Sequence, residues 1–225
     1  MLKRIVLLLI VTLVATLTAT ASDREDDVDR IHHADQVFNE IMNAPDQSIP
    51  GNLLNNAKCI AIIPGEVKFA FIFGGNYGRG IATCRTSDNK WTAPLFIAIS
   101  GGSVGYQIGG SSTDLVLLFM NDHALHSLLS DRFKLGADAS VAAGPVGRSA
   151  TADTDLKLNA EILSYSRAKG IFAGVSLSGA VVRTDKGADD AMYGDSVTRD
   201  ALIHGQVPAP ESAAPLLHTI HQFAG

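Results

Sequence analysis

The sequence predicts an α+β domain, in which an antiparallel-rich, glycine-bent β-sheet or barrel-like core carries helices at both termini. Apolar residues recur at helical spacing near the start of the chain, and again towards its end. Between them, short apolar or alternating runs are separated by Gly, Pro, Asn, Asp and Ser, which is typical of strands and turns. We find no long linker and no internal repeat, so a single packed domain is expected.

The composition narrows the class of protein. Of the 225 residues, 46% are apolar and 18% are charged, which is too apolar for a disordered chain and too weakly charged for a coiled coil. The net charge is -5, so the chain as a whole does not attract the negatively charged phosphate backbone of nucleic acids. Nucleic acid is therefore not expected as a partner. We expect no cofactor.

Residues 1–21 resemble a secretory signal peptide. Lys3 and Arg4 precede an uncharged run from Ile5 to Leu17, and Ala19-Thr20-Ala21 is a small-x-small cleavage site. An uncleaved membrane anchor is the alternative, although the apolar stretch is at the short limit for spanning a bilayer. The sequence therefore predicts export to the periplasm or the extracellular space. Peripheral attachment of the exported protein to a membrane is one of the expected alternatives.

The first helix is expected over residues 23–42, because its apolar positions recur every three or four residues. Pro45 and Pro50 close this segment, and a short helix can follow over 52–57. Strands are expected over 59–63, 67–73, 80–84, 95–99, 104–108, 115–120, 137–142, 161–167, 171–177 and 180–184. Pro64-Gly65 and Gly74-Gly75-Asn76 are predicted to be turns.

Helical segments are also expected over 122–130, 189–193 and 197–204. Prolines 208, 210 and 215 then mark an extended connection to a short C-terminal helix. On this basis residues 22–204 form the domain, including its N-terminal amphipathic helix, and residues 205–225 form a proline-containing tail.

Two cysteines, Cys59 and Cys84, give the even count that permits a disulfide in an oxidising compartment. If 58–63, 67–74 and 78–85 were consecutive strands of a simple meander, however, the two would lie about two strand spacings apart, beyond the ~7 Å limit between Cα atoms. Either the thiols are free, or the first strand lies elsewhere.

Gly101-Gly102-Ser103-Val104-Gly105 matches the GxSxG pattern of a serine esterase. Asp114 or Asp153, with His204 or His218, would complete a triad. A nucleophile elbow needs a following helix, whereas this sequence continues through a short glycine-broken stretch. We therefore interpret the segment as a glycine-bent strand pair and expect no catalytic residue.

His123 and His126 are three residues apart, a spacing that can place two imidazoles on one helix face. No third ligand accompanies them, so no metal site is expected. Cations stand near expected turns and strand ends, with solvated charge as the default interpretation: Lys58, Lys68, Arg79, Arg85, Arg148, Arg167, Lys169 and Arg183.

Several separated segments together resemble the SYLF domain family, in its secreted bacterial type, over roughly residues 23–194. They are Leu54–Ile63, Trp91–Pro94, Gly101–Gly110, Thr113-Asp114, Ser140–Arg148 and Tyr165–Ser176. The resemblance implies a non-enzymatic domain that binds phospholipid, since eukaryotic members bind phosphoinositides and some bind actin. It also implies a disulfide between Cys59 and Cys84, since secreted members tend to carry cysteines there.

This chain departs from the eukaryotic pattern, because residues 22–27 are acidic rather than basic. Actin is not expected as a partner of an exported protein. Phospholipid or a membrane surface is the leading expectation, with a structural or protein-interaction role in the envelope as the alternative and an esterase as the third. The candidate lipid-binding residues are the cations at glycine-flanked turns: Arg79, Arg148, Arg167 and Lys169.

Overall fold

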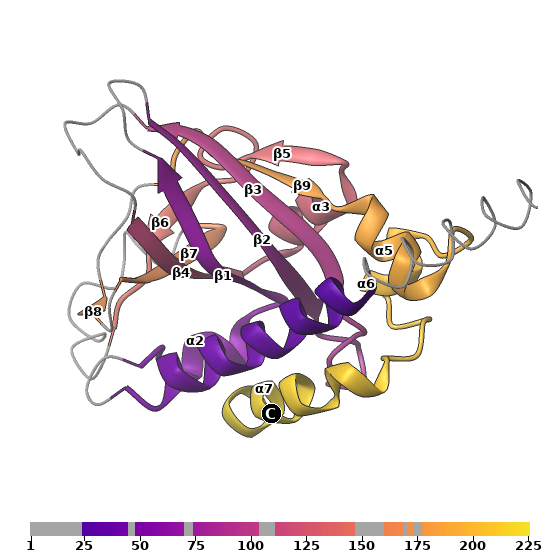
Figure 1. The fold of residues 1–225 in the computed structure, drawn as a ribbon. Helices are drawn as coiled ribbons and strands as arrows, with labels where there is room; N and C mark the ends of the chain where they lie inside the picture. The colour runs from indigo at the N-terminus through magenta and orange to yellow at the C-terminus, as the bar shows by residue number, and fades with distance from the viewer. Residues whose placement is uncertain are drawn as a thin grey trace, which may run out of the picture.

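The structure is a computed structural model that describes residues 24–44, 48–69, 74–103, 111–146, 160–168, 171–172 and 177–225. The expected signal peptide, residues 1–21, lies outside these residues. In the described part, nine strands form one curled, half-barrel sheet that is antiparallel except where β6 joins β7 (Figure 1). The strands are β1 (Cys59–Phe69), β2 (Gly74–Cys84), β3 (Leu95–Ser103), β4 (Ser111–Phe119), β5 (Arg132–Lys134), β6 (Val141–Ala143), β7 (Ile162–Ala168), β8 (Ile171–Phe172) and β9 (Val181–Thr184).

Their order across the sheet is β5-β9-β3-β2-β1-β4-β7-β6, with β8 paired to β7. The N-terminal helix covers residues 24–42. It is followed by α2 (Gly51–Asn56), α3 (Asp122–Leu129), α5 (Lys186–Tyr193), α6 (Arg199–Ile203), a short 3-10 helix (Glu211–Ala213) and α7 (Ala214–Ala224). The α+β prediction, with helices at both termini of the sheet, is therefore confirmed.

Both faces of the central strands are buried, because side chains alternate between two cores. Ile60 and Ile62 of β1 face the core beneath the N-terminal helix, α2 and α7. The intervening Cys59, Ala61 and Ile63 face the core beneath α3 and α6. Burial on both faces explains why Cys59–Ile63 of β1 and Leu115–Phe119 of β4 are continuous apolar runs rather than alternating ones.

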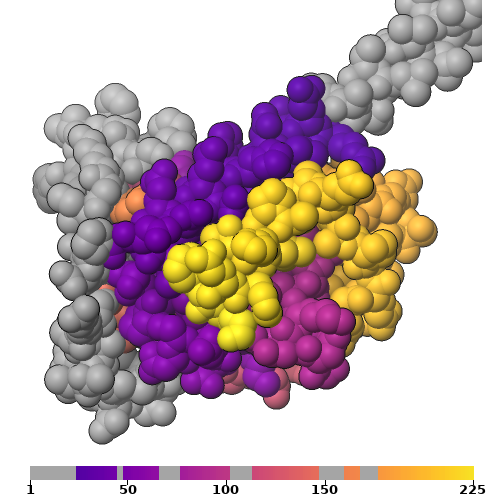
Figure 2. All heavy atoms as spheres, turned by 90° about the horizontal axis from the view of Figure 1, so that it is seen from below, coloured from indigo at the N-terminus to yellow at the C-terminus, as the bar shows by residue number. Residues whose placement is uncertain are grey.

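The N-terminal helix and α7 lie side by side over the first of these cores (Figures 1 and 2). Phe38 and Phe223 meet edge to face across the two helices, with ring centroids 6.4 Å apart. Leu216, Ile220 and Ala224 of α7 are fully buried. The segment expected as a tail therefore ends in a helix that belongs to the packed core.

The predicted turn at Pro64-Gly65 is wrong, because both residues lie within β1. The register between β1 and β2 shifts between Ile62 and Val67, which marks a bulge, and Gly65 takes a positive φ of 58° there. Gly80 of β2 lies opposite, where an added β-carbon would stand 2.8 Å from the Cα of Ile63. The absence of a side chain at Gly80 thus admits the bulged backbone.

The turn predicted at Gly74-Gly75-Asn76 is also wrong, since these residues pair in β2 with residues 103–101 of β3. β1 and β2 are therefore two long paired strands where three meandering strands were expected. The strand expected over 137–142 is correct only at its end, in β6, while β5 was not predicted. No helix in the described ranges is both long and apolar enough to cross a membrane.

Candidate functional site

Two of the four candidate lipid-binding cations, Arg79 on β2 and Arg167 on β7, lie in the described part of the chain. Arg148 and Lys169 lie outside it. The strand order puts β1 and β4 between the two described arginines, so the sheet does not bring them together. Each has its own set of partners.

Arg79 is held by carboxylates. Its guanidinium lies 3.0 Å from Asp185 and 3.6 Å from Asp27, and Arg30 of the N-terminal helix binds the same two carboxylates. Burial lowers the pKa of Arg79, but the hydrogen bond and charge of Asp185 outweigh burial and raise it overall. A small hollow of about 250 Å³ adjoins these groups, and its lining includes Asp26 as a third carboxylate. Such surroundings do not favour a bound anion.

Arg167 is mostly buried, with 11% of its side chain exposed. Its Nη2 contacts Glu40 of the N-terminal helix and lies 3.1 Å from Asp114 of β4. Asp114 also accepts a hydrogen bond of 3.0 Å from the backbone N–H of Gly65 at the bulge. Burial lowers the pKa of Arg167, and its two carboxylate partners raise it above the usual value.

The two arginines therefore share a structural role. Arg79 reaches Asp27 near the start of the N-terminal helix, and Arg167 reaches Glu40 near its end. Both ends of this helix are tied to the sheet by ion pairs, in addition to the apolar contacts beneath it. The charges of both arginines are compensated within the fold.

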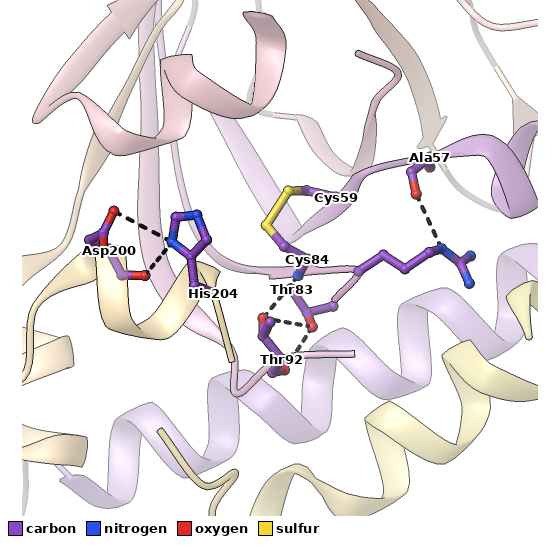
Figure 3. The surroundings of a disulfide bond; sticks show 8 residues. Ala57, Cys59, Thr83, Cys84, Thr92, Asp200 and His204 are labelled. Carbon is purple, nitrogen blue, oxygen red and sulfur yellow. Dashed lines mark hydrogen bonds and ion pairs between the residues drawn. A yellow bond between two sulfur atoms is a disulfide. The ribbon is translucent and has the colours of Figure 1, made fainter. Parts of the chain in front are cut away.

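The disulfide site is structural as well. Cys59 and Cys84 are directly opposite each other in β1 and β2 and are joined by a disulfide (Figure 3). Thr83 donates a hydrogen bond to the carbonyl of Thr92, and the hydroxyl of Thr92 accepts the backbone N–H of Cys84 at 3.0 Å. The meander register that separated the cysteines is wrong because β1 and β2 are immediate neighbours.

Arg85 follows this disulfide and connects three elements. Its guanidinium lies 4.4 Å from the centroid of the Trp91 ring. It donates hydrogen bonds to the carbonyls of Leu54 in α2 and Ala224 in α7, at 3.3 and 2.6 Å. A cation at the carboxyl ends of two helices is stabilised by their dipoles. Burial lowers the pKa of Arg85. Its guanidinium is engaged by these two carbonyls and by the Trp91 ring.

The esterase constellation is not assembled in the described residues. Ser103 is the last residue of β3 and pairs with Gly74, so residues 101–103 continue a strand where an elbow would require a sharp turn. Asp114 is engaged by Arg167 and Gly65. The ring of His204 is bound to Asp200 beside the disulfide (Figure 3). Asp153 lies outside the described residues.

In the described part of the chain, His123 is engaged by a carboxylate and belongs to no metal centre. His123 Nδ1 lies 2.6 Å from Glu161 Oε1, and the second oxygen of Glu161 accepts the backbone N–H of Ser140 at 2.8 Å. That backbone hydrogen bond, with the contacts of Ser140 and His123 side chains, lowers the pKa of Glu161. Over the described ranges, no group of three or more His, Cys, Asp or Glu side chains is arranged to hold a metal ion.

Two cations that were not predicted as site residues, Arg132 and Lys134, lie on the edge strand β5 beside Arg183 of β9. About fifty residues separate β5 from β9 in the chain, so spacing alone could not bring these residues together. The feature of the sequence that could have identified β5 is the alternation of polar and apolar residues in Arg132-Phe133-Lys134, which is typical of a strand with one buried face.

Comparison with known proteins places the fold in a family. Residues 100–223 match the family model Ysc84, described as "Las17-binding protein actin regulator". The chain is 36% identical over 189 residues to Protein YSC84 of Saccharomyces cerevisiae, and 32% identical over 189 residues to the human SH3 domain-containing YSC84-like protein 1. Each match covers 83% of this chain, but 40% of the yeast protein and 55% of the human one. The chain belongs to the Ysc84/SYLF domain family.

Proposed function

We propose that this chain is a non-catalytic domain of the secreted bacterial type that binds anionic phospholipid at the cell envelope. Family membership supports a binding role, and residues 101–103 of the GxSxG pattern lie in the strand β3. Of the cations predicted from the sequence, Arg148 and Lys169 remain candidates for the lipid contact. Arg79 and Arg167 are less suited to it, because carboxylates already compensate their charge.

One observation carries the lipid proposal. Arg132 and Arg183 stand directly opposite each other on adjacent strands, both exposed, and neither forms an ion pair with any described carboxylate. Like charges in this arrangement repel each other. An external anion relieves that repulsion, and a membrane with anionic headgroups supplies one.

Binding can be measured by co-sedimentation with liposomes. We expect the protein to pellet with vesicles of phosphatidylcholine and phosphatidylglycerol, and to stay in solution with phosphatidylcholine alone. Added salt should release it, because exposed charges are screened within about 10 Å at 0.1 M ionic strength. Pelleting with both kinds of vesicle at high salt would mean that the contact is apolar and would contradict the electrostatic proposal.

Export is supported by the signal-like residues 1–21 and by the Cys59–Cys84 disulfide, since such bonds persist in oxidising compartments. Mass spectrometry of the protein from its natural source should find a mature chain that begins at Ser22. An intact N-terminus recovered in the membrane fraction would instead identify the apolar run as an anchor.

A protein partner is the second candidate function, favoured by the description of the matching family as actin regulators. For an exported chain, an envelope protein takes the place of actin. Failure to bind any liposome, together with crosslinking to an envelope protein in intact cells, would favour this candidate over the lipid proposal.

A further inference from the structure

The edge of the sheet formed by β5 and β9 gathers three basic residues on one face. We infer that Arg132, Lys134 and Arg183 form the contact site for the phosphate groups of anionic phospholipids, so that this edge faces the membrane. The inference rests on the proposed function and assigns it to three residues, of which the sequence pointed only to Arg183, as one of several cations near turns and strand ends.

The register of the two strands fixes the grouping. Arg132 pairs with Arg183, Phe133 with Val182, and Lys134 with Val181. Phe133 and Val182 are buried in the core beneath α3 and α6, so their neighbours in sequence point to the opposite face. All three cations are exposed there.

The strands that carry the three cations are fixed by the buried residues between them. Phe133 meets the ring of Phe119 edge to face, with centroids 6.1 Å apart, and Val182 is 1% exposed. The backbones that carry the cations are therefore held by core packing, and their pairing places the cations near one another without the ordering of a loop. Preorganised charges bind an anion with a smaller entropy loss than mobile ones.

Nearby carboxylates do not neutralise the three cations. The carboxylate of Asp131 lies 3.5 Å from Arg199, and Asp138 accepts the backbone N–H of Lys134 at 2.7 Å. Within the described ranges, no ion pair reaches the side chains of Arg132, Lys134 or Arg183. By contrast, three exposed lysines elsewhere have partners: Lys58 with Asp122, Lys90 with Asp88, and Lys186 with Asp190.

The chemistry of the three side chains suits phosphate. Guanidinium groups present paired N–H donors that match phosphate oxygens, and the lysine adds a mobile point charge. An exposed, shallow group of this kind fits headgroups at a surface better than a ligand that must be enclosed. Arg183 pairs with Ala98 of β3, and Ala98 pairs with Arg79 of β2, so Arg79 lies on the same face two strands away. Its charge is already compensated by Asp185.

The test compares two triple variants of the full mature chain, each losing three positive charges. One carries Arg132→Gln, Lys134→Gln and Arg183→Gln; the matched control carries Lys58→Gln, Lys90→Gln and Lys186→Gln. With phosphatidylcholine–phosphatidylglycerol vesicles, we expect the first to lose affinity by at least about tenfold, because each basic residue near an anionic surface is worth about fivefold. The control should lose less than about threefold, because its lysines are spread over separate elements and already paired.

Thermal unfolding shows whether each variant is folded, and removal of the facing Arg132–Arg183 pair should leave the midpoint unchanged or raise it. Equal losses in both variants would show that binding follows net charge and would overturn the assignment. Full binding by the first variant would overturn it too, while leaving lipid binding in place. If the unmodified protein binds no vesicle, the proposed function fails as well.

Discussion

Removing the Cys59–Cys84 disulfide is expected to lower the free energy of unfolding by about 3.5 kcal/mol, the chain-entropy value for a loop of this size. The two cysteines are 25 residues apart and close the open end of the β1–β2 hairpin. Cross-linking there removes conformations from the unfolded chain. Denaturant unfolding of the oxidised protein, and of the protein reduced while unfolded, measures the difference.

The matched control is the variant in which both cysteines are replaced by alanine. Its stability should lie near that of the reduced protein and should not respond to reductant. The oxidised protein should show no reactive thiol in denaturant. Two reactive thiols per chain in protein from its natural compartment, or equal unfolding midpoints with and without reductant, would contradict this expectation.

The same hairpin shows what the sequence can and cannot reveal. The apolar runs at Cys59–Ile63 and 115–120 identified strands, because buried strands are apolar throughout. Pro64-Gly65 and Gly74-Gly75 have the residue types of turns, yet the structure uses the first for a bulge and the second for close pairing with β3. Local residue types do not distinguish these uses, because the neighbouring strand decides between them.

For the candidate site, too, the sequence identifies the cations, whereas only the fold determines which of them have partners. Arg79 and Arg167 were expected at glycine-flanked turns, but they lie within the strands β2 and β7. There, tertiary folding brings Asp27, Glu40, Asp114 and Asp185 to them. Those carboxylates come from elements as many as 127 residues away in the chain, as between Arg167 and Glu40. Conversely, Arg132 and Arg183 meet only through the β5–β9 register. Charge compensation is thus a property of the fold that a linear pattern of cations does not contain.

A second large effect is expected at Asp189 of α5, whose side chain is buried and accepts the backbone N–H of Phe96 at 2.8 Å. Burial raises the pKa of this carboxyl from 3.8 to about 7, despite the opposing effects of the Phe96 hydrogen bond and the charge of Arg199. Between these two pKa values the folded protein keeps a proton that the unfolded chain releases. Stability from this group is therefore present at low pH and is lost as the pH rises from about 4 to about 7.

The variant Asp189→Asn stays neutral at every pH and can still accept the hydrogen bond from Phe96. We expect it to match the unmodified protein near pH 4 and to exceed its free energy of unfolding at pH 8, by up to about 4 kcal/mol for three pKa units. Comparing the two proteins across this range cancels the titration of all other groups. The neighbouring change Asp190→Asn serves as the control: it removes the exposed ion pair with Lys186 and should cost less than about 1 kcal/mol. Its gain at high pH should be small, because burial, and not the charge of Asp190, is the largest cause of the raised pKa of Asp189. A difference between Asp189→Asn and the unmodified protein that stays constant from pH 4 to pH 8 would show that Asp189 titrates as an ordinary carboxyl, and that the polar groups around it offset its burial.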